Sequence, residues 1–318
     1  MPPYGWYLAQ GLLPLGEDSS DDEEGPTTLP NGRIVCAPHG LVTCGKCCTD
    51  YSFMDDDDED EEEEEDEKMN RSLSPEDVPA IDANQGLPSD FRIPEDLFGT
   101  KKRRGTGHVL PSKFDTSPSN HPTDLFLEQS TYGALSRYIH RDNPDQILIF
   151  TDGACLNNGQ PNPAAGWAFV HGPGSAGQPL ITSGRLERKG PFGEDCIQSS
   201  NRAELRAVIA ALRFRHWVGE GFTSVVFATD SEYVVEGSTQ WANSWVQNGW
   251  KTSAGKGVKN KDLWEMLLGE VERWQEKGLV IKFWRIPRAW NHVADAAAKS
   301  AAAEVEVDEW ADAYGLCI

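Results

Sequence analysis

Four acidic side chains of this 318-residue sequence stand where strands and helices are predicted to meet. Asp152 and Asp230 each follow an apolar run typical of a buried strand, and strand ends in α/β sheets are common ligand sites. Glu204 borders the apolar stripe of a predicted helix, and Asp295 falls in the first turn of an alanine-rich one. Four carboxylates converging on one partly buried point would repel one another without a cation. The set is therefore a candidate site for Mg²⁺ or Mn²⁺.

The chemistry of such a site would be phosphodiester hydrolysis. Two ions about 4 Å apart clamp the attacking and leaving oxygens of a phosphodiester. Each acid also has a simpler interpretation. Asp152 can be a turn or N-cap residue, Glu204 a solvated helix residue, and Asp295 an acid favoured by the helix dipole. From residue types and spacing alone, both interpretations remain open.

The elements that would position these acids begin near residue 144. Short apolar runs predict strands at 147–150, 165–170, 181–186, 225–228 and 279–286. Helical spacing predicts helices at 201–217, 261–276 and 291–304. Strands followed by helices indicate an α/β fold, a mixed sheet covered by helices. A short apolar stretch upstream, 132–139, is predicted to be a lead-in helix.

Several motifs add a resemblance to a known family. Four motifs occur in order across about residues 145–305: Thr-Asp-Gly-Ala-Cys-Leu-Asn-Asn-Gly (151–159), Asn-Arg-Ala-Glu-Leu (201–205), Thr-Asp-Ser-Glu-Tyr-Val (229–234) and Trp-Ala-Asn-Ser-Trp-Val-Gln-Asn-Gly-Trp-Lys-Thr-Ser-Ala-Gly (241–255). In these motifs the chain resembles type 1 ribonuclease H of the eukaryotic-like kind, with a long acidic amino-terminal extension. The resemblance implies a ribonuclease H-like fold, with a five-stranded mixed sheet flanked by helices.

The same resemblance implies an activity and its catalytic residues. The family's activity is an endoribonuclease that hydrolyses the RNA strand of RNA·DNA hybrids and leaves 5′-phosphate and 3′-hydroxyl ends. Two Mg²⁺ ions, or Mn²⁺ in their place, would be bound by four catalytic acids at the matching positions: Asp152, Glu204, Asp230 and Asp295.

The chain departs from the family before the last acid. The usual Gly-His-x-Gly loop is replaced by Ile-Pro-Arg-Ala-Trp-Asn-His-Val-Ala-Asp (286–295). His292 is expected to be a surface residue at the start of a helix, so the loop histidine's role is not transferred to it. Arg288 or metal-bound water is expected to assist proton transfer or product release. The altered segment keeps a second hypothesis open, a non-catalytic nucleic-acid-binding or protein-interaction protein with the same fold.

Aromatic and basic residues downstream predict how substrate would be held. Trp241 and Trp245 share a helical face and precede a loop with four lysines, the composition of a nucleic-acid groove. Core tryptophans beside a solvated loop are the alternative. The resemblance assigns Trp241, Trp245 and Ser253 to DNA contacts, Ser199 and Asn260 to a DNA phosphate pocket whose usual arginine is Ile197 here, and Asn158, Ser200 and Asn201 to the minor groove and ribose hydroxyls.

A separate cluster near the amino terminus combines Cys36, His39, Cys44 and Cys47 within twelve residues. Paired ligands of this kind suit tetrahedral Zn²⁺, and a redox-sensitive cysteine cluster is the alternative. Because a run of thirteen acids follows at 55–67, we expect this segment to contact a protein partner and not nucleic acid.

The net charge of −22 is unevenly distributed. Residues 1–145 hold 31 acidic and 12 basic side chains, a charge of −19, whereas residues 146–318 hold 20 and 17, a charge of −3. The bulk acidity, which argues against nucleic acid, therefore lies mostly outside the predicted domain. The predicted domains are 1–29 disordered, 30–52 zinc-binding, 53–143 an acidic disordered linker, 144–306 catalytic, and 307–318 a tail.

Localisation can be predicted only broadly. No run of about 18 apolar residues predicts a membrane span, and the first residues lack a leader-like basic region. The seven cysteines do not form the pattern of a secreted disulfide framework. We expect a nuclear or cytoplasmic, non-secreted monomer, with the basic quartet 101–104 a weak candidate import signal.

Overall fold

The computed structural model describes residues 26–29, 34–36, 40, 43–44, 49–50, 101–131, 135–174, 178–252 and 255–315. Most of this chain is built around one mixed sheet of eight strands. The strands of that sheet are β5 (Ser112–Lys113), β6 (Phe126–Ser130), β7 (Ser136–His140), β8 (Asn143–Leu156), β9 (Ala164–Pro173), β10 (Pro179–Arg185), β11 (Ser224–Thr229) and β12 (Val280–Arg285). They are arranged in the order β10-β9-β8-β11-β12-β5, and β7, itself paired with β6, joins β8.

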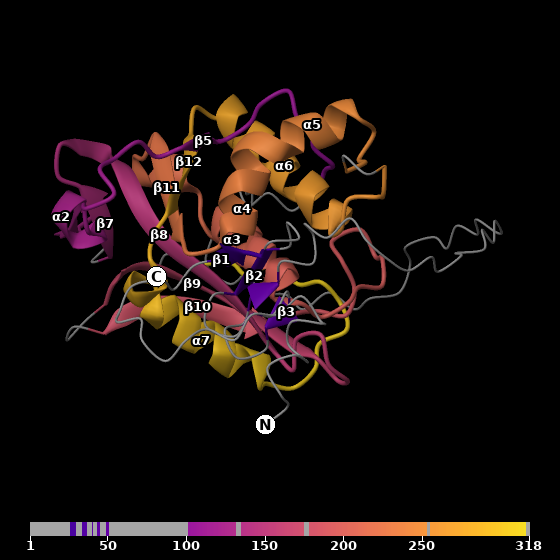
Figure 1. Ribbon diagram of the computed structural model, residues 1–318. Helices are drawn as coiled ribbons and strands as arrows, with labels where there is room; N and C mark the ends of the chain where they lie inside the picture. The colour runs from indigo at the N-terminus through magenta and orange to yellow at the C-terminus, as the bar shows by residue number, and fades with distance from the viewer. Residues whose placement is uncertain are drawn as a thin grey trace, which may run out of the picture.

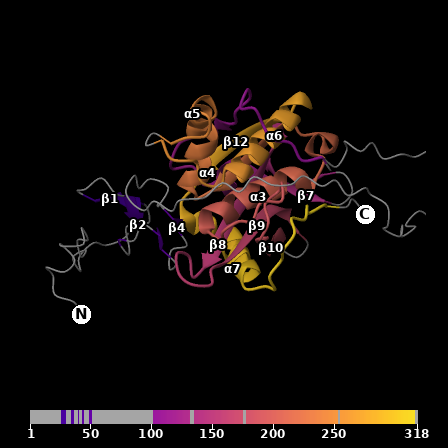
Figure 2. The ribbon, with the colours of Figure 1, turned by 90° about the vertical axis from the view of Figure 1, so that its right-hand side faces the viewer.

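Helices cover both faces of the sheet. The helical elements are α2 (Pro122–Leu125), α3 (Ser200–Phe214), η4 (Trp217–Glu220), α4 (Glu232–Glu236), η5 (Gly237–Trp241), α5 (Ala242–Gln247), α6 (Lys261–Glu276), η6 (Arg288–Trp290) and α7 (His292–Ala302). Figures 1 and 2 show α7 on one side of the sheet and α3, α4 and α6 on the other. Near the amino terminus, β1 (Pro26–Thr28) pairs with β2 (Ile34–Cys36), and β3 (Thr43–Cys44) with β4 (Thr49–Asp50). No helix among the described residues is long and apolar enough to cross a membrane.

Strand β8 faces both layers with alternate side chains, as a period of two requires. Ile147 and Ile149 belong to the main core beneath α3 and α6. Ala154 faces the other way and packs with Ala168 and Ala298, which lets α7 approach closely. Strands β8 to β12 and the two helix layers confirm the predicted α/β fold, and the sheet has three strands more than the five predicted.

Two predictions for the segment before residue 144 are wrong. The stretch 132–139 was expected to be helical, but its described part forms β7, in which the buried Arg137 and Ile139 alternate with partly exposed neighbours. The acidic linker was expected to run to residue 143, yet residues 101–131 form a strand, a short helix and part of a hairpin on the folded domain. The polar composition of these residues did not predict the elements, because they become ordered only through tertiary contacts.

Residues 101–114, called the strap below, account for part of this difference. In Figure 1 the strap runs beside α6 to β5, which pairs in parallel with β12. Arg103 donates to the Gly269 carbonyl on α6 and pairs with Glu276, and Arg104 pairs with Glu265. The strap is thus attached to α6 by ion pairs and to β12 by sheet pairing.

Candidate active site

Two of the four predicted acids are brought together by neighbouring parallel strands. β11 pairs with β8 in a register that places Ala228 opposite Phe150, so Asp230 and Asp152 occupy corresponding positions two residues further on. Asp152 lies inside β8 and not at its end as predicted, because β8 continues along β9 to Leu156. Since β11 ends at Thr229, β8 has no neighbour on that side beyond this point. Side chains from both faces of the sheet can therefore meet there.

Glu204 approaches this gap because a glycine allows α3 to cross β8 closely. A Cβ atom on Gly153 would lie 2.1 Å from the Glu204 nitrogen and 2.3 Å from the Ala203 carbonyl carbon. The residue after Asp152 must therefore be glycine for the helix to keep this position. The Glu204 carboxylate accepts a hydrogen bond from the Ser231 hydroxyl, which also caps α4. Sequence reasoning missed Ser231, although it directly follows Asp230.

Asp295 comes from the opposite layer, in the first turn of α7. Arg288 donates to its Oδ1 at 2.7 Å, and Lys299 donates to its Oδ2 at 2.8 Å. Arg288 was predicted to assist the site, whereas Lys299 was not singled out. Both carboxylate oxygens of Asp295 are thus engaged by cationic side chains of the chain itself. His292 is the first residue of α7 and is exposed, as predicted.

Asn291 joins the two strands at the site. Its side-chain nitrogen donates to the Thr151 carbonyl oxygen at 3.0 Å and to Oδ1 of Asp230 at 2.8 Å. Asn291 is only 1% exposed, and its Oδ1 accepts no hydrogen bond from the described part of the chain. This side chain fixes Asp230 beside the backbone of β8. The asparagine in the 286–295 segment was the available signal for this role.

The electrostatics of Asp152 tie the four acids into one group. Asp152 is 5% exposed. Burial raises its pKa well above the usual value, and the negative charges of Asp230, Glu204 and Asp295 raise it further, opposed by Arg288. A buried carboxylate facing three others favours a bound proton or a cation. The four acids are therefore close enough for the charges of the other three to affect Asp152, as the predicted convergence requires.

The donor set suits a hard divalent cation, with one reservation in the geometry. All four candidate ligands carry carboxylate oxygens, which Mg²⁺ and Mn²⁺ prefer. Among the described residues, however, no group of three or more His, Cys, Asp or Glu side chains is placed to hold a metal ion as it stands. The ion pairs of Asp295 account for part of this, because they direct its oxygens to Arg288 and Lys299.

The two residues assigned to a phosphate pocket cap adjacent helices. Ser199 is the N-cap of α3, and Asn260 is the N-cap of α6. Arg202 in the first turn of α3 donates to Asp262 in the first turn of α6 at 2.8 Å, so the two helix starts lie side by side. Helix N-termini favour anions. Ile197, where the family has arginine, is 70% exposed.

The predicted groove residues have different surroundings. The rings of Trp241 and Trp245 are tilted against each other with a centroid distance of 5.9 Å. Both side chains are partly buried against the main core, so only part of each ring is accessible to a ligand. The four lysines that follow, Lys251, Lys256, Lys259 and Lys261, are exposed. Ser253 lies outside the described residues.

The residues assigned to the minor groove are buried in this structure. Asn158 is 2% exposed, Ser200 0% and Asn201 6%. The Asn158 Nδ2 and the Ser200 hydroxyl are buried and have no hydrogen-bond partner among the residues that the structure describes. Buried polar atoms without partners are uncommon and often mark functional sites.

The predicted zinc ligands cannot be placed. His39 and Cys47 lie outside the described residues, as do the side chains of Cys36 and Cys44.

Comparisons with known proteins identify the family to which this chain is similar. Residues 144–303 match the model of the RNase H family. The ribonuclease H of Treponema pallidum is 44% identical over 125 residues, which cover 38% of this chain and 70% of that protein. The ribonuclease H of Chromohalobacter salexigens is 35% identical over 161 residues, covering 51% and 87%. A solved structure of LC9-RNase H1, described as a type 1 RNase H with the type 2 active-site motif, has 30% identity, covers 50% of this chain and 72% of its own, and gives a TM-score of 0.35.

Proposed function

The chain belongs to the RNase H family, and we propose that its four carboxylates catalyse hydrolysis of the RNA strand of RNA·DNA hybrids. The chain is accordingly a hydrolase, a ribonuclease H. The observation that supports this site most directly is Asp152, buried in β8 with a pKa raised by three further carboxylates. Strongly perturbed acids of this kind are typical of catalytic centres. The products would carry 5′-phosphate and 3′-hydroxyl ends.

Divalent cations fit the proposed site. Asp152, Glu204, Asp230 and Asp295 would hold Mg²⁺, in a two-ion arrangement that also accepts Mn²⁺. Bound there, the ions supply charge stabilisation and an activated water at the phosphodiester. The chain's own contribution is to orient the ligands, through Ser231 for Glu204 and Asn291 for Asp230. Arg288 and Lys299 would have to share Asp295 with the ions, or release it.

Substrate binding would use the basic and helix-terminal groups around this centre. The exposed lysines between 251 and 261 would meet phosphates of the DNA strand beside the half-buried Trp241 and Trp245. The adjacent N-termini of α3 and α6, which begin after Ser199 and Asn260, would bind one further phosphate. Contacts to 2′-hydroxyls, which distinguish RNA from DNA, would come from Asn158, Ser200 and Asn201, and these buried side chains would first have to become accessible to the substrate.

The decisive experiment compares cleavage of an RNA·DNA hybrid, double-stranded RNA and single-stranded RNA in Mg²⁺. We expect the hybrid alone to be cut efficiently, and Asp152→Asn to lower kcat by at least about a hundredfold, as removal of one key electrostatic group does. Asp145→Asn, an exposed acid on the same strand, serves as the matched control. Equal cleavage of all three substrates, or full activity of Asp152→Asn, would refute the proposal.

One observation favours the alternative of a non-catalytic binding protein. Asp295 is already neutralised by two cationic side chains. A binder with this fold would retain a hybrid and release no fragments over hours, whether Mg²⁺ is present or absent. Single-turnover kinetics with enzyme in excess separates this outcome from slow product release.

The amino-terminal zinc site remains a separate proposal, in which Cys36, His39, Cys44 and Cys47 bind Zn²⁺ and the segment contacts a protein partner. Metal analysis of the full chain, purified under reducing conditions, should find about one zinc per chain. A Cys44→Ser, Cys47→Ser variant should lose it.

A further inference from the structure

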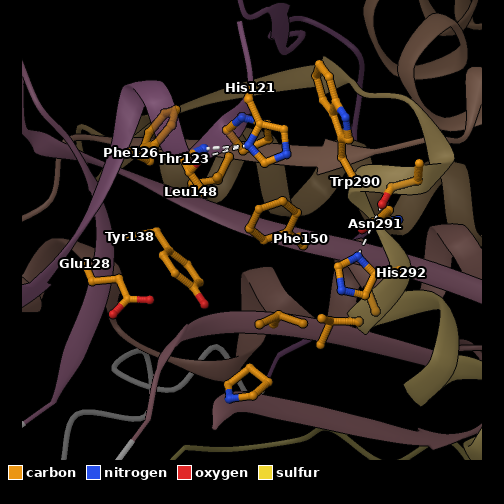
Figure 3. Close-up of a pocket in the computed structure, with 16 residues that line it drawn as sticks. His121, Thr123, Phe126, Glu128, Tyr138, Leu148, Phe150, Trp290, Asn291 and His292 are labelled. Atoms are coloured by element: carbon orange, nitrogen blue, oxygen red, sulfur yellow. Dashed lines mark hydrogen bonds between the residues drawn. The ribbon is translucent and has the colours of Figure 1, made fainter. Parts of the chain in front are cut away.

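An aromatic cavity of about 220 Å³ lies beside the candidate active site. It is lined by α2, the β6–β7 hairpin, strands β8, β9 and β10, η6 and the start of α7, and is called the hairpin pocket below. Figure 3 shows His121 and Tyr138 on the hairpin side and Trp290, Asn291 and His292 on the α7 side. Much of its wall comes from residues 121–138, upstream of the segment that matches the RNase H family.

The hairpin pocket lies along the face of β8 that also carries Asp152. Leu148 and Phe150 line the cavity and alternate along the strand with the same orientation as Asp152. Two residues of a strand advance about 7 Å, so the cavity begins within that distance of Asp152 along the chain. Asn291 also lines the cavity while its amide holds Asp230. A ligand in the cavity would thus lie next to the reacting phosphate.

The lining suits a planar ring with polar edges. Tyr138 meets Phe150 edge-on at a centroid distance of 5.8 Å, and His121 meets Trp290 at 4.7 Å. Aromatic walls at these angles favour stacking and edge contacts with a further ring. The Tyr138 hydroxyl points into the cavity in Figure 3 and makes no hydrogen bond to any residue that the structure describes. It is available to a polar group of a ligand.

The charges of the lining indicate that the group bound inside the pocket is not a phosphate. No lysine or arginine is among the described residues that line the hairpin pocket, and the one carboxylate there is Glu128. Burial and the charge of Glu128 raise the pKa of Tyr138, so its hydroxyl keeps its proton and can donate. The ligand should therefore be an uncharged aromatic group, whose linked phosphates remain outside at the carboxylate site.

We propose that the hairpin pocket binds one unpaired nucleobase of the nucleic acid that lies across the carboxylates. This inference rests on the proposed function, and names a feature of its substrate. A paired base is stacked inside the duplex, so only an unpaired nucleotide can turn into a protein cavity at low cost. The pocket would make the enzyme favour hybrids with a bulged or mismatched ribonucleotide next to the cleavage site.

The test uses the full chain and two RNA·DNA hybrids that differ by one bulged 2-aminopurine ribonucleotide. Binding is measured in EDTA, where no divalent ion supports hydrolysis. We expect the bulged hybrid to bind about tenfold more tightly than the matched one, a gain of ~1.4 kcal/mol within the range for stacking on aromatic side chains. The 2-aminopurine fluorescence should be quenched on binding.

Two variants and one control locate the effect. Tyr138→Leu replaces an aromatic ring in the wall of the pocket with an aliphatic side chain. Thr123→Trp places a large ring at the entrance of the pocket, from an exposed position on α2. Both should reduce the tenfold preference to within about twofold of unity and relieve the quenching. Tyr314→Leu makes the same substitution as Tyr138→Leu on the carboxy-terminal segment, away from the pocket, and should leave the preference unchanged. Thermal melts of each variant check that it is folded.

Several results would overturn the proposal. The first is equal affinity for the two hybrids, and the second is quenching that persists in both pocket variants. The third is that free adenosine and cytidine monophosphates displace both hybrids while the protein shows no preference for the bulged one. The last result would mean that the cavity takes free nucleotides and no substrate base. Mg²⁺-dependent cleavage of the matched hybrid by the same preparation tests the proposed function separately, so its failure is distinguishable from failure of the pocket.

Discussion

Asp152 illustrates how a catalytic position is held at a cost to stability. It is fixed inside a buried strand, opposite Asp230 and beside Glu204, where its charge is opposed by burial and by three other acids. The neighbouring glycine, Gly153, allows α3 to approach closely enough for this crowding. A protein without a functional need for these charges would gain stability by removing one of them.

We therefore predict that Asp152→Asn inactivates the enzyme and stabilises it. Without divalent ions, loss of the repulsion should raise Tm by about 2–4 °C, the shift expected for a gain near 1 kcal/mol. Adding Mg²⁺ should raise the Tm of the wild type by mass action and that of the variant much less. Calorimetry in EDTA and in Mg²⁺ measures both shifts. A variant that melts below the wild type in EDTA would show that the four acids do not repel one another.

A second residue, His171, gives a pH dependence of stability with a defined sign. Burial, reinforced by the charges of Arg137 and Arg215, lowers the pKa of His171 to about 3. The unfolded chain titrates near 6.5, so between these values it binds a proton that the folded chain excludes. The free energy of unfolding should consequently fall as pH drops below about 6.5, by up to about 1.4 kcal/mol per pH unit.

The variant His171→Phe isolates this effect, because it keeps a ring against Phe169 and Phe214 and removes the titrating group. Urea unfolding at pH 7, 6 and 5 should show a smaller loss of stability for the variant than for the wild type. Parallel losses in the two proteins would mean that His171 is protonated in the folded state.

At the scale of elements, the strap shows how a polar segment becomes part of the fold. It crosses α6 where two glycines face each other: a Cβ on Gly105 would lie 2.3 Å from the Gly269 nitrogen, and one on Gly269 would lie 2.2 Å from the Arg103 oxygen. The Glu272 carboxylate accepts hydrogen bonds from the Thr106 and Gly107 nitrogens at 2.7 and 2.8 Å. These contacts also engage part of the basic quartet 101–104, which as an import signal would first have to detach.

Gly105→Ala should separate the strap from α6 or strain both. We predict a loss of about 1–3 kcal/mol in unfolding free energy, the usual cost of overpacking, and faster proteolytic cleavage within residues 101–114. Gly257→Ala is the matched control, because a Cβ there meets no atom within 4 Å. If the two variants resist urea and protease equally, the strap crossing is not tight.

The same elements show what sequence could and could not predict. The helix Lys261–Glu276 was predicted to the residue because its apolar spacing is regular. The prediction that Asp152 and Asp230 lie on neighbouring strands is confirmed, since parallel strands place corresponding residues together. β7 and the strap were missed, because the burial of Arg137 depends on distant partners such as Glu220, and the need for glycine at residue 105 depends on its contact with α6 at Gly269. Such partners lie 83 and 164 residues away, beyond any local pattern.

For the whole molecule, the structure moves the boundary between acidic extension and folded domain. Residues 1–100 hold 26 acidic and 5 basic side chains, a charge of −21, and residues 101–318 hold 25 and 24, a charge of −1. Nearly all of the net charge therefore precedes the strap. With the strap included, the part of the chain that would bind nucleic acid is close to neutral. The segment 251–261 with its four exposed lysines, called the lysine loop below, is a local positive surface.

An extension of charge −21 should compete with nucleic acid for that lysine loop, because both are polyanions. Deleting residues 1–100 should then tighten hybrid binding severalfold at low salt, with the dissociation constant measured by fluorescence anisotropy in EDTA. The gain should vanish near 1 M salt, where the screening length falls to about 3 Å. Replacing Lys256 and Lys259 by glutamine in the full chain should remove most of the difference between full-length and shortened proteins. Equal affinities of the two chains at low salt would mean that the extension does not restrain the enzyme, and would leave partner binding as its remaining role.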